Sequence, residues 1–318
     1  MRLAFVIVIS AILFGCNDSA KTIYPASDVV MELKQVSEHV YYVQGQAGVA
    51  TDNEGFISNA GFVITDEGVV VFDGLGTPSL ADLLLTKIRS VTDKKILKVI
   101  VSHYHADHIY GLQVFKDLGA EIIAPKGVMD YLSSPEAEER IEERRFSLEP
   151  WVNETTYLVT PDVIIDKAME FKSGGLTFKI DLLGAAHSEG DLTLYVEPDR
   201  VLFSGDIIFE GRVPYLGDAN TKKWLETLTE METSKVKALI PGHGPAAKNP
   251  NHAISATRNY LAKVRAIMRN AVENLDDFAE TYDNADWSEF EKLPAFEAAN
   301  RRNAYQVYLS MEAELLSR

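Results

Sequence analysis

Three of the seven histidines in the chain lie in one short segment, SHYHADH, which ends at His108. The segment directly follows residues 96–101, an apolar run that is typical of a buried strand. Side chains two positions apart in an extended chain point the same way, so His103, His105 and Asp107 are expected to converge. His108 is expected to turn back toward them from the start of the next helix. Imidazoles and carboxylates are good ligands for zinc and similar divalent ions, and the segment therefore predicts a metal site.

Three further candidate ligands follow predicted strands farther along the chain. They are His187 in the motif GAAHSEGD, Asp206 in LFSGD and His243 in IPGHGP. Ligand sites on α/β scaffolds are commonly built where strands end, and the small residues around each position let the backbone approach an ion. The remaining histidines, His39 and His252, have no comparable setting and are interpreted as structural or surface residues. A lone buried histidine is usually a structural group, but the density of donors in SHYHADH argues for a metal.

The segments around these residues read as strands and helices in two similar halves. In the first half, strands are expected at residues 40–43, 58–65, 69–73, 96–101 and 121–124, and helices at 78–91, 109–118 and 136–146. In the second half, strands are expected at 163–165, 169–171, 176–182, 192–196, 201–203 and 238–240, and a helix at 222–231. Sheet packed on sheet with helices outside predicts an α/β fold, a four-layer αββα sandwich. Residues 249–318 are predicted to form a C-terminal helical extension packed on it.

The order of the motifs HYHADH, AHSEGD, FSGD and PGHG resembles that of the metallo-β-lactamase-fold hydrolase superfamily over about residues 36–245. Asp73, which ends the strand in VVVFDG, matches the acidic residue usually found beneath the site of this family. The resemblance implies a metallo-β-lactamase sandwich domain over residues 36–248, with a dinuclear site between its sheets. By position, it assigns His103, His105 and His187 to one metal ion, Asp107, His108 and His243 to the second, and Asp206 to a bridge between them. Zinc is the first choice of metal, and iron or manganese is also compatible with such a donor set.

The resemblance also implies a reaction. A hydroxide that bridges the two ions attacks a carbonyl group of the substrate, and protonated Asp107 or a new water protonates the leaving group. An aspartate at position 206 resembles the thioesterase (glyoxalase-II-like) and lactonase branches, so the predicted substrate is a thioester, an ester or a lactone. Hydrolysis of β-lactams is one alternative, and a non-catalytic periplasmic metal-binding protein is another. Residues 211–245 and FEAANRRNAYQVYL are similar to a periplasmic branch associated with sulfur oxidation and quinoprotein systems.

Charge narrows the possible partners. The net charge of −16 argues against a nucleic acid, because phosphate binding needs clustered lysines and arginines. Arg144 and Arg145 follow two glutamates and are interpreted as part of a solvated helix face. Arg212 is a candidate to hold a carboxylate of a small-molecule substrate, and the alternative is a surface arginine paired with Glu210. The oligomeric state is not predicted by these patterns.

Residues 1–16 differ in composition from the rest of the chain. After a short positive start, residues 3–14 are apolar apart from one serine, a run too short to cross a bilayer of about 30 Å but suited to a secretory signal. It leads to Cys16, the only cysteine, in a context that resembles the lipobox of bacterial lipoproteins; an ordinary cleaved signal is the alternative. We therefore expect lipidation of Cys16, a linker over residues 17–35 and a periplasmic protein that touches the membrane only through its anchor. Any metal site must then be built from histidine, aspartate and glutamate.

Overall fold

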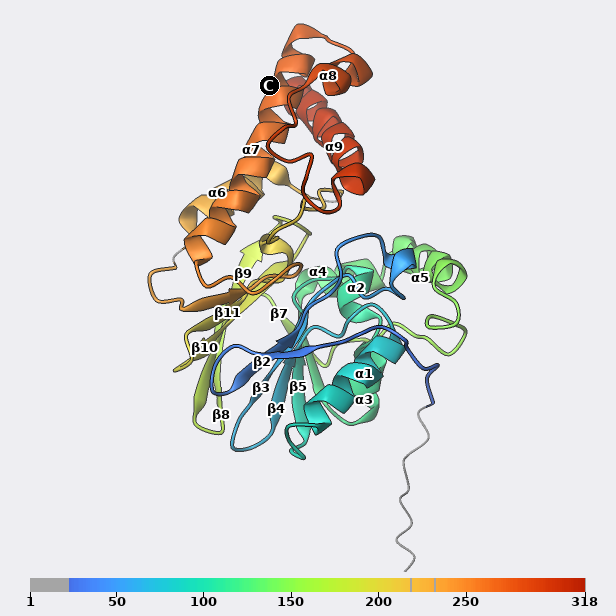
Figure 1. Cartoon of the computed structure of the whole chain (residues 1–318), viewed down its shortest axis with the longest axis vertical. Helices are drawn as coiled ribbons and strands as arrows, with labels where there is room; N and C mark the ends of the chain where they lie inside the picture. Colours follow the sequence, from blue (N-terminus) through green and yellow to red (C-terminus); the bar gives the residue numbers. More distant parts are fainter. Residues whose placement is uncertain (1–22, 218, 232, 318) are drawn as a thin grey trace, which may run out of the picture.

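Two β-sheets lie face to face in the computed structural model of the chain, and helices cover their outer faces (Figure 1). The structure describes residues 23–217, 219–231 and 233–317. This arrangement confirms the predicted four-layer αββα sandwich. The predicted signal segment, Cys16 and the first residues of the predicted linker lie outside the described residues. Within the described part of the chain, no helix combines the length and the apolar character needed to cross a membrane.

Within the described residues, the first sheet has seven strands, in the order in which they occur along the chain. They are β1 (Leu33–Gln35), β2 (Val40–Val43), β3 (Ala60–Ile64), β4 (Val69–Phe72), β5 (Ile96–Ile100), β6 (Glu121–Pro125) and β7 (Val163–Ile165). Neighbours from β1 to β4 are antiparallel, and those from β4 to β7 are parallel. Strand β1 corrects the linker predicted over residues 17–35, because Leu33 pairs with Val43 and Met31 is buried. This strand is too short to show a pattern of its own, and its pairing with β2 defines it.

The helices that accompany the first sheet in the described residues are α1 (Pro78–Arg89), α2 (Ala106–Ile109), α3 (Leu112–Asp117), α4 (Lys126–Leu132) and α5 (Pro135–Ser147). The prediction of one helix over residues 109–118 is wrong, because α2 begins at Ala106 and Gly111 separates α2 from α3. A Cβ atom on Gly111 would lie 2.1 Å from the carbonyl oxygen of Gly74. Gly111 therefore lets the chain pass tightly over the end of β4, and the early start of α2 places Asp107 on a helix.

The second sheet runs in the order β12-β11-β10-β9-β8. Its strands are β8 (Met169–Ser173), β9 (Leu176–Gly184), β10 (Asp191–Glu197), β11 (Val201–Phe203) and β12 (Ala238–Ile240), and α6 (Thr221–Glu230) lies between β11 and β12 in the chain. Strands β11 and β12 are parallel, and the other neighbours are antiparallel. The carboxyl ends of β9, β11 and β12 therefore share one edge of the sheet. The segments that carry His187, Asp206 and His243 leave from that edge.

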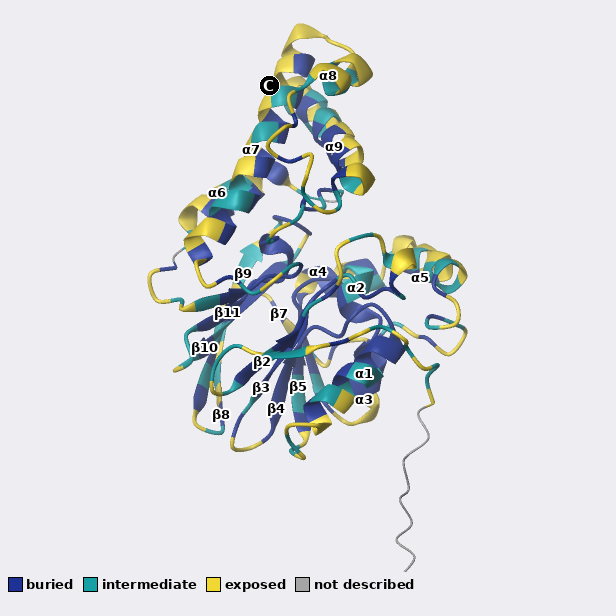
Figure 2. Ribbon diagram, viewed as in Figure 1, coloured by how far each residue is buried: buried dark blue, intermediate teal, exposed yellow. Residues whose placement is uncertain are grey.

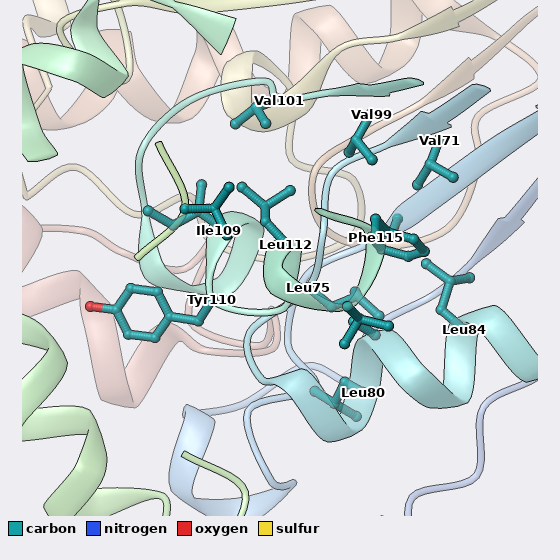
Figure 3. Close-up of a cluster of buried hydrophobic side chains, with 14 of the residues drawn as sticks. Val71, Leu75, Leu80, Leu84, Val99, Val101, Ile109, Tyr110, Leu112 and Phe115 are labelled. Carbon is teal, nitrogen blue, oxygen red and sulfur yellow. The ribbon is translucent and has the colours of Figure 1, made fainter. Parts of the chain in front are cut away.

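Strand β4 shows how the strands divide the core. All of its residues are buried, because the strand is covered on both faces. Val69 and Val71 belong to the apolar cluster that includes α1 and α3 (Figure 3). Val70 and Phe72 face the second sheet, where the Phe72 ring stacks on Phe203 with centroids 5.0 Å apart. Figure 2 shows the result: buried residues fill the middle of the sandwich, and exposed residues lie on loops and on the outer helices.

The C-terminal extension consists of α7 (Pro250–Asn274), α8 (Phe278–Asn284) and α9 (Phe296–Leu316), which project from one end of the sandwich (Figure 1). Helices α7 and α9 share an apolar cluster with Trp224 of α6. Asn303 of α9 accepts a hydrogen bond from the backbone N–H of Leu216 at 3.0 Å and donates one to the carbonyl of Pro214 at 2.7 Å. The extension is therefore helical, and α9 is attached to the loop that follows Asp206.

Candidate metal centre

Asp73, which follows β4, positions two segments beneath the site. Its carboxylate accepts hydrogen bonds from the backbone N–H and the hydroxyl of Ser102, at 2.7 and 2.8 Å, and these hold the start of the loop after β5. The same carboxylate lies 2.9 Å from Nδ1 of His108. Asp73 is buried, so its contribution is to orient Ser102 and His108.

Three histidines and one aspartate form the first group of candidate ligands. Nδ1 of His105 lies 3.0 Å from Nε2 of His103 and 2.9 Å from Nε2 of His187. Oδ2 of Asp206 lies 3.3 Å from Nε2 of His187 and 3.9 Å from Nε2 of His103. One ligand atom of each residue falls within 4.8 Å of those of the others. This spacing is compact enough to hold one metal ion.

Asp107, His108 and His243 form a second such group. Oδ2 of Asp107 lies 3.5 Å from Nε2 of His108 and 3.3 Å from Nε2 of His243. Asp206 also reaches this group: its Oδ1 lies 3.2 Å from Nε2 of His108, and its Oδ2 lies 3.2 Å from Nε2 of His243. The structure thus brings together all seven residues that the sequence singled out, with Asp206 between the groups. The extended-chain argument for Asp107 is wrong, however, because helix α2 turns this residue away from its expected partners and toward His243.

Hydrogen bonds on the outer ring nitrogens orient the inner ones. In the neutral rings, Nδ1–H of His108 donates to the carboxylate of Asp73 at 2.9 Å, and Nδ1–H of His243 donates to the backbone carbonyl of Ile57 at 2.7 Å. The hydroxyl of Ser102 donates to the same carboxylate and therefore accepts from Nδ1–H of His103 at 2.9 Å. A neutral imidazole has only one N–H, so Nε2 of each of these rings directs a lone pair into the centre. This is the arrangement found around metal-binding histidines.

The donor atoms fit divalent cations. Nδ1 of His105 meets Nε2 atoms of two other histidines at 2.9 and 3.0 Å, and the few N–H groups of neutral rings cannot satisfy all these nitrogens together. Nε2 of His108 and Oδ1 of Asp206 lie 3.2 Å apart without the geometry of a hydrogen bond, and neither atom has another hydrogen-bond partner in the part of the chain that the structure describes. Such atoms carry a desolvation cost that a coordinated cation would remove.

The electrostatics of the centre point the same way. Burial lowers the pKa of the His187 imidazole to about 3 and that of His103 well below its usual range. Burial also disfavours the charged form of His108, but Asp206 and Asp107 outweigh it and raise the pKa of that ring. Burial raises the pKa of the Asp206 and Asp107 carboxyls, but the neighbouring histidines lower it by more. The pKa of each carboxyl therefore lies below its usual range. Ionised carboxylates beside neutral imidazoles favour a cation, and a metal ion would replace the proton on His108.

Glycines let the strand ends close around Asp206. A Cβ atom on Gly242 would lie 1.9 Å from Oδ1 of Asp206. Gly205 has a φ of 50°, and its Cβ atom would lie 2.7 Å from Cβ of Ser102. The small residues of the motifs FSGD and PGHG are therefore required for the close approach of the two loops.

The family described as the metallo-beta-lactamase superfamily matches residues 53–243, which is more than half of the chain and includes every candidate ligand. The chain belongs to the metallo-beta-lactamase superfamily. This membership makes it a metal-dependent hydrolase.

Two relatives carry the family name. The chain is 22% identical over 210 residues to metallo-beta-lactamase IND-1 of Chryseobacterium indologenes. The aligned region covers 64% of this chain and 77% of that protein. It is 24% identical over 193 residues to a metallo-beta-lactamase type 2 of Elizabethkingia meningoseptica. That alignment covers 59% of this chain and 69% of the relative.

Solved structures share the fold. A metallo-beta-lactamase from Pontibacter korlensis matches with a TM-score of 0.60 at 20% identity, over 73% of this chain and 99% of that one. The stereoselective inverting sec-alkylsulfatase Pisa1 from Pseudomonas sp. matches with a TM-score of 0.64 at 20% identity, over 88% of this chain and 50% of that one. The residues before the C-terminal extension, 1–248, make up less than 88% of the chain. The match to the sec-alkylsulfatase therefore extends into the C-terminal extension.

A cavity of about 270 Å³ opens over the two groups of candidate metal ligands. Asp107, Asp206, His243 and Arg212 lie in its wall. Nη1 of Arg212 lies 3.4 Å from Nδ1 of His243, and burial lowers the pKa of the guanidinium. The alternative, an ion pair between Arg212 and Glu210, is not found among the described residues, where Oε2 of Glu210 also has no hydrogen-bond partner. Arg212 therefore faces the cavity beside the second group.

Several residues of the cavity wall were not predicted from the sequence. Arg140 and Arg144 of α5 and Arg302 of α9 line it, and this corrects the interpretation of Arg144 as part of a solvated helix face. The i, i+4 spacing of Arg140 and Arg144 is a local signal that they share one face of a helix. Tyr215 also lines the cavity, with its ring 5.9 Å from that of His105. No local pattern connects Arg302 or Tyr215 with the metal motif.

Proposed function

We propose that this protein is a dinuclear, zinc-dependent hydrolase that cleaves the bond between the carbonyl carbon and the leaving sulfur or oxygen of a thioester, an ester or a lactone. The supporting observation is the position of one carboxylate oxygen. Oδ2 of Asp206 lies 3.3 Å from Nε2 of His187 and 3.2 Å from Nε2 of His243, one residue from each group. A ligand atom shared in this way suits two ions held side by side, as in two-metal hydrolytic sites. Zinc suits a donor set of histidines and aspartates, and iron or manganese is the alternative.

Within this proposal the groups of the site have separate tasks. Bound zinc ions would supply a nucleophile at neutral pH and an electrophile for the substrate oxygen. Arg212 would hold a carboxylate of the substrate through its fork of N–H donors. The side chain of Asp107 is 17% exposed and that of Asp206 only 3%, so Asp107 is the carboxylate that a substrate in the cavity reaches. Its ionised oxygen can take up a proton and pass it to the leaving group.

Hydrolysis of β-lactams is the second candidate function. It is favoured by the two relatives above, which are named metallo-beta-lactamases and of which this chain covers 77% and 69%. A sulfate ester is a useful third test substrate, because the match to the sec-alkylsulfatase reaches into the C-terminal extension. Thioesters, lactones and β-lactams all present a carbonyl to the same ligand set. Relative rates must therefore separate them.

The experiment measures metal content first and turnover second. Zinc-loaded protein is analysed for bound metal by mass spectrometry and then assayed on thioesters, esters, a lactone, nitrocefin and a secondary alkyl sulfate. We expect two zinc ions per chain and the highest kcat/KM on a thioester, an ester or a lactone. The highest value on nitrocefin would select the second candidate. Two bound ions without turnover on any substrate would favour the non-catalytic metal-binding protein.

The Asp107→Ala variant tests the assigned mechanism. We expect kcat to fall by about 10²- to 10⁴-fold, because the variant removes a proton carrier as well as a ligand of the second group. Asp166→Ala, in an exposed turn between β7 and β8, is the matched control and is expected to keep the wild-type rate. Hydrolysis by Asp107→Ala at the wild-type rate would remove Asp107 from the mechanism.

The proposed location is the bacterial periplasm, with the chain anchored to the membrane by a lipid on Cys16. Residues 1–16 support this proposal, because a positive start and an apolar run precede the only cysteine. The Cys16→Ser variant of the full chain is expected to leave the membrane fraction of the cell. Its retention in that fraction would contradict the anchor.

A further inference from the structure

Four arginines of the described part of the chain line the cavity over the metal centre. Arg140 and Arg144 come from α5, Arg212 from the loop after β11, and Arg302 from α9. Among the described residues, Glu136 is the one carboxylate of the wall that does not belong to the candidate ligands. The chain as a whole carries a net charge of −16. The concentration of positive charge is therefore a local property of this cavity.

An aromatic ring holds Arg302 at a distance from the metal centre. The guanidinium carbon of Arg302 lies 5.5 Å from the centroid of the Tyr215 ring, which is a cation–π distance. The same ring meets that of His105 edge-on, with centroids 5.9 Å apart. Because Tyr215 contacts both residues, it spaces Arg302 away from the candidate ligands. A molecule that touches Arg302 does so at a point remote from its reacting group.

The arginines of α5 have ion pairs that a bound anion can replace. Arg140 lies 3.2 Å from Glu136, and Arg144 lies 3.9 Å from Glu143. Both glutamate side chains are 55% exposed, and surface pairs of this kind contribute little to stability. An anion in the cavity would therefore exchange for these glutamates at small cost.

Small and aromatic side chains also line the cavity. Helix α9 contributes Ala298 and Ala299, and Ala295 directly precedes the helix. Tyr104, from the loop after β5, stacks on Tyr131 of α4 with ring centroids 4.7 Å apart, and both residues line the cavity. These side chains can pack against an apolar part of a ligand whose charged end meets the arginines.

We propose that the cavity selects substrates that carry a carboxylate or similar oxyanion at the end remote from the bond that is cleaved, with Arg302 and Arg144 as specificity-determining residues. The planar guanidinium fork matches the geometry of such anions. A cavity lined by one sign of charge also concentrates ligands of the opposite sign. The C-terminal extension thereby becomes part of the substrate site. This proposal rests on the proposed function only for the position of the bond that is cleaved.

Equilibrium binding tests the proposal without turnover. The probes are glutarate and glutaramide, which have the same length but differ in charge, titrated calorimetrically into zinc-loaded protein. We expect wild-type protein to prefer glutarate, and Arg302→Gln and Arg144→Gln each to lower its affinity roughly 10- to 100-fold. Arg301→Gln is the matched control on α9, because Arg301 pairs with Asp283 at 2.6 Å and is not among the residues that line the cavity. Its glutarate affinity is expected to be that of wild-type protein.

Kinetics supply the second readout. For a thioester with a distal carboxylate, KM is expected to rise in Arg302→Gln by the factor lost in binding while kcat is unchanged. KM for the matching distal carboxamide should not change, and Arg302→Lys should restore part of the affinity. The proposal would be overturned if Arg302→Gln and Arg144→Gln both bound glutarate as tightly as wild-type protein. It would also be overturned if Arg301→Gln lost as much glutarate affinity as they do. Binding that depends on Arg302 without any turnover would overturn only the proposed function.

Discussion

Replacing Asp206 by Ala is expected to empty the metal centre and to lower kcat/KM by about 10³-fold or more, because bound metal ions contribute several kcal/mol to stabilising the transition state. The carboxylate of Asp206 lies 3.2 Å from His108 and from His243 and 3.3 Å from His187. Its removal takes the shared ligand from both groups at once. Metal analysis of the purified variant and its rate on the preferred substrate measure the two effects.

The Asp206→Asn variant separates charge from shape. The amide has the size of the carboxylate, so it preserves the tight packing against Gly242, whose Cβ atom would lie 1.9 Å from Oδ1. It lacks the negative charge, and we expect it to lose metal as well. Asp66→Asn, at a side chain that is 93% exposed, is the control expected to keep metal and activity. Two zinc ions and the wild-type rate in Asp206→Asn would contradict the bridging role.

Replacing Trp224 by Ala is expected to lower the free energy of unfolding by about 3–5 kcal/mol. The indole is fully buried in the cluster that joins α6 to α7 and α9. Its Nε1–H donates to the carbonyl of Ile207 at 3.0 Å, and its ring lies 5.2 Å from that of His187. The loss combines a cavity with a buried carbonyl that has lost its donor. Denaturant titration of the zinc-free protein measures it apart from metal binding.

Two variants define the origin of that loss. Trp224→Phe fills much of the space and removes the hydrogen bond, so we expect a smaller decrease of about 1–3 kcal/mol. Lys223→Ala, at a neighbouring side chain that is 49% exposed, is expected to change stability by less than about 0.5 kcal/mol. A decrease below about 1 kcal/mol in Trp224→Ala would show that the α6 interface adds little to the stability of the fold.

Strong local patterns predicted the elements that depend mainly on their own residues. The strands Val40–Val43 and Val201–Phe203 have the predicted bounds, because unbroken apolar runs need burial on both faces. Elements that depend on a partner were missed. Strand β1 exists through its pairing with β2, and the break between α2 and α3 depends on the contact of Gly111 with Gly74.

The same distinction applies to the candidate site. Residue types and motif density were sufficient to name the donor set, because few side chains other than imidazole and carboxylate bind such ions. The division of the donors into two groups required the fold, since helix α2 begins at Ala106 and turns Asp107 toward His243. The arginines of the cavity required it even more. Arg144 and Arg302 line the same cavity only because α5 and α9 are packed around it. Local periodicity in the sequence does not predict contacts between distant segments.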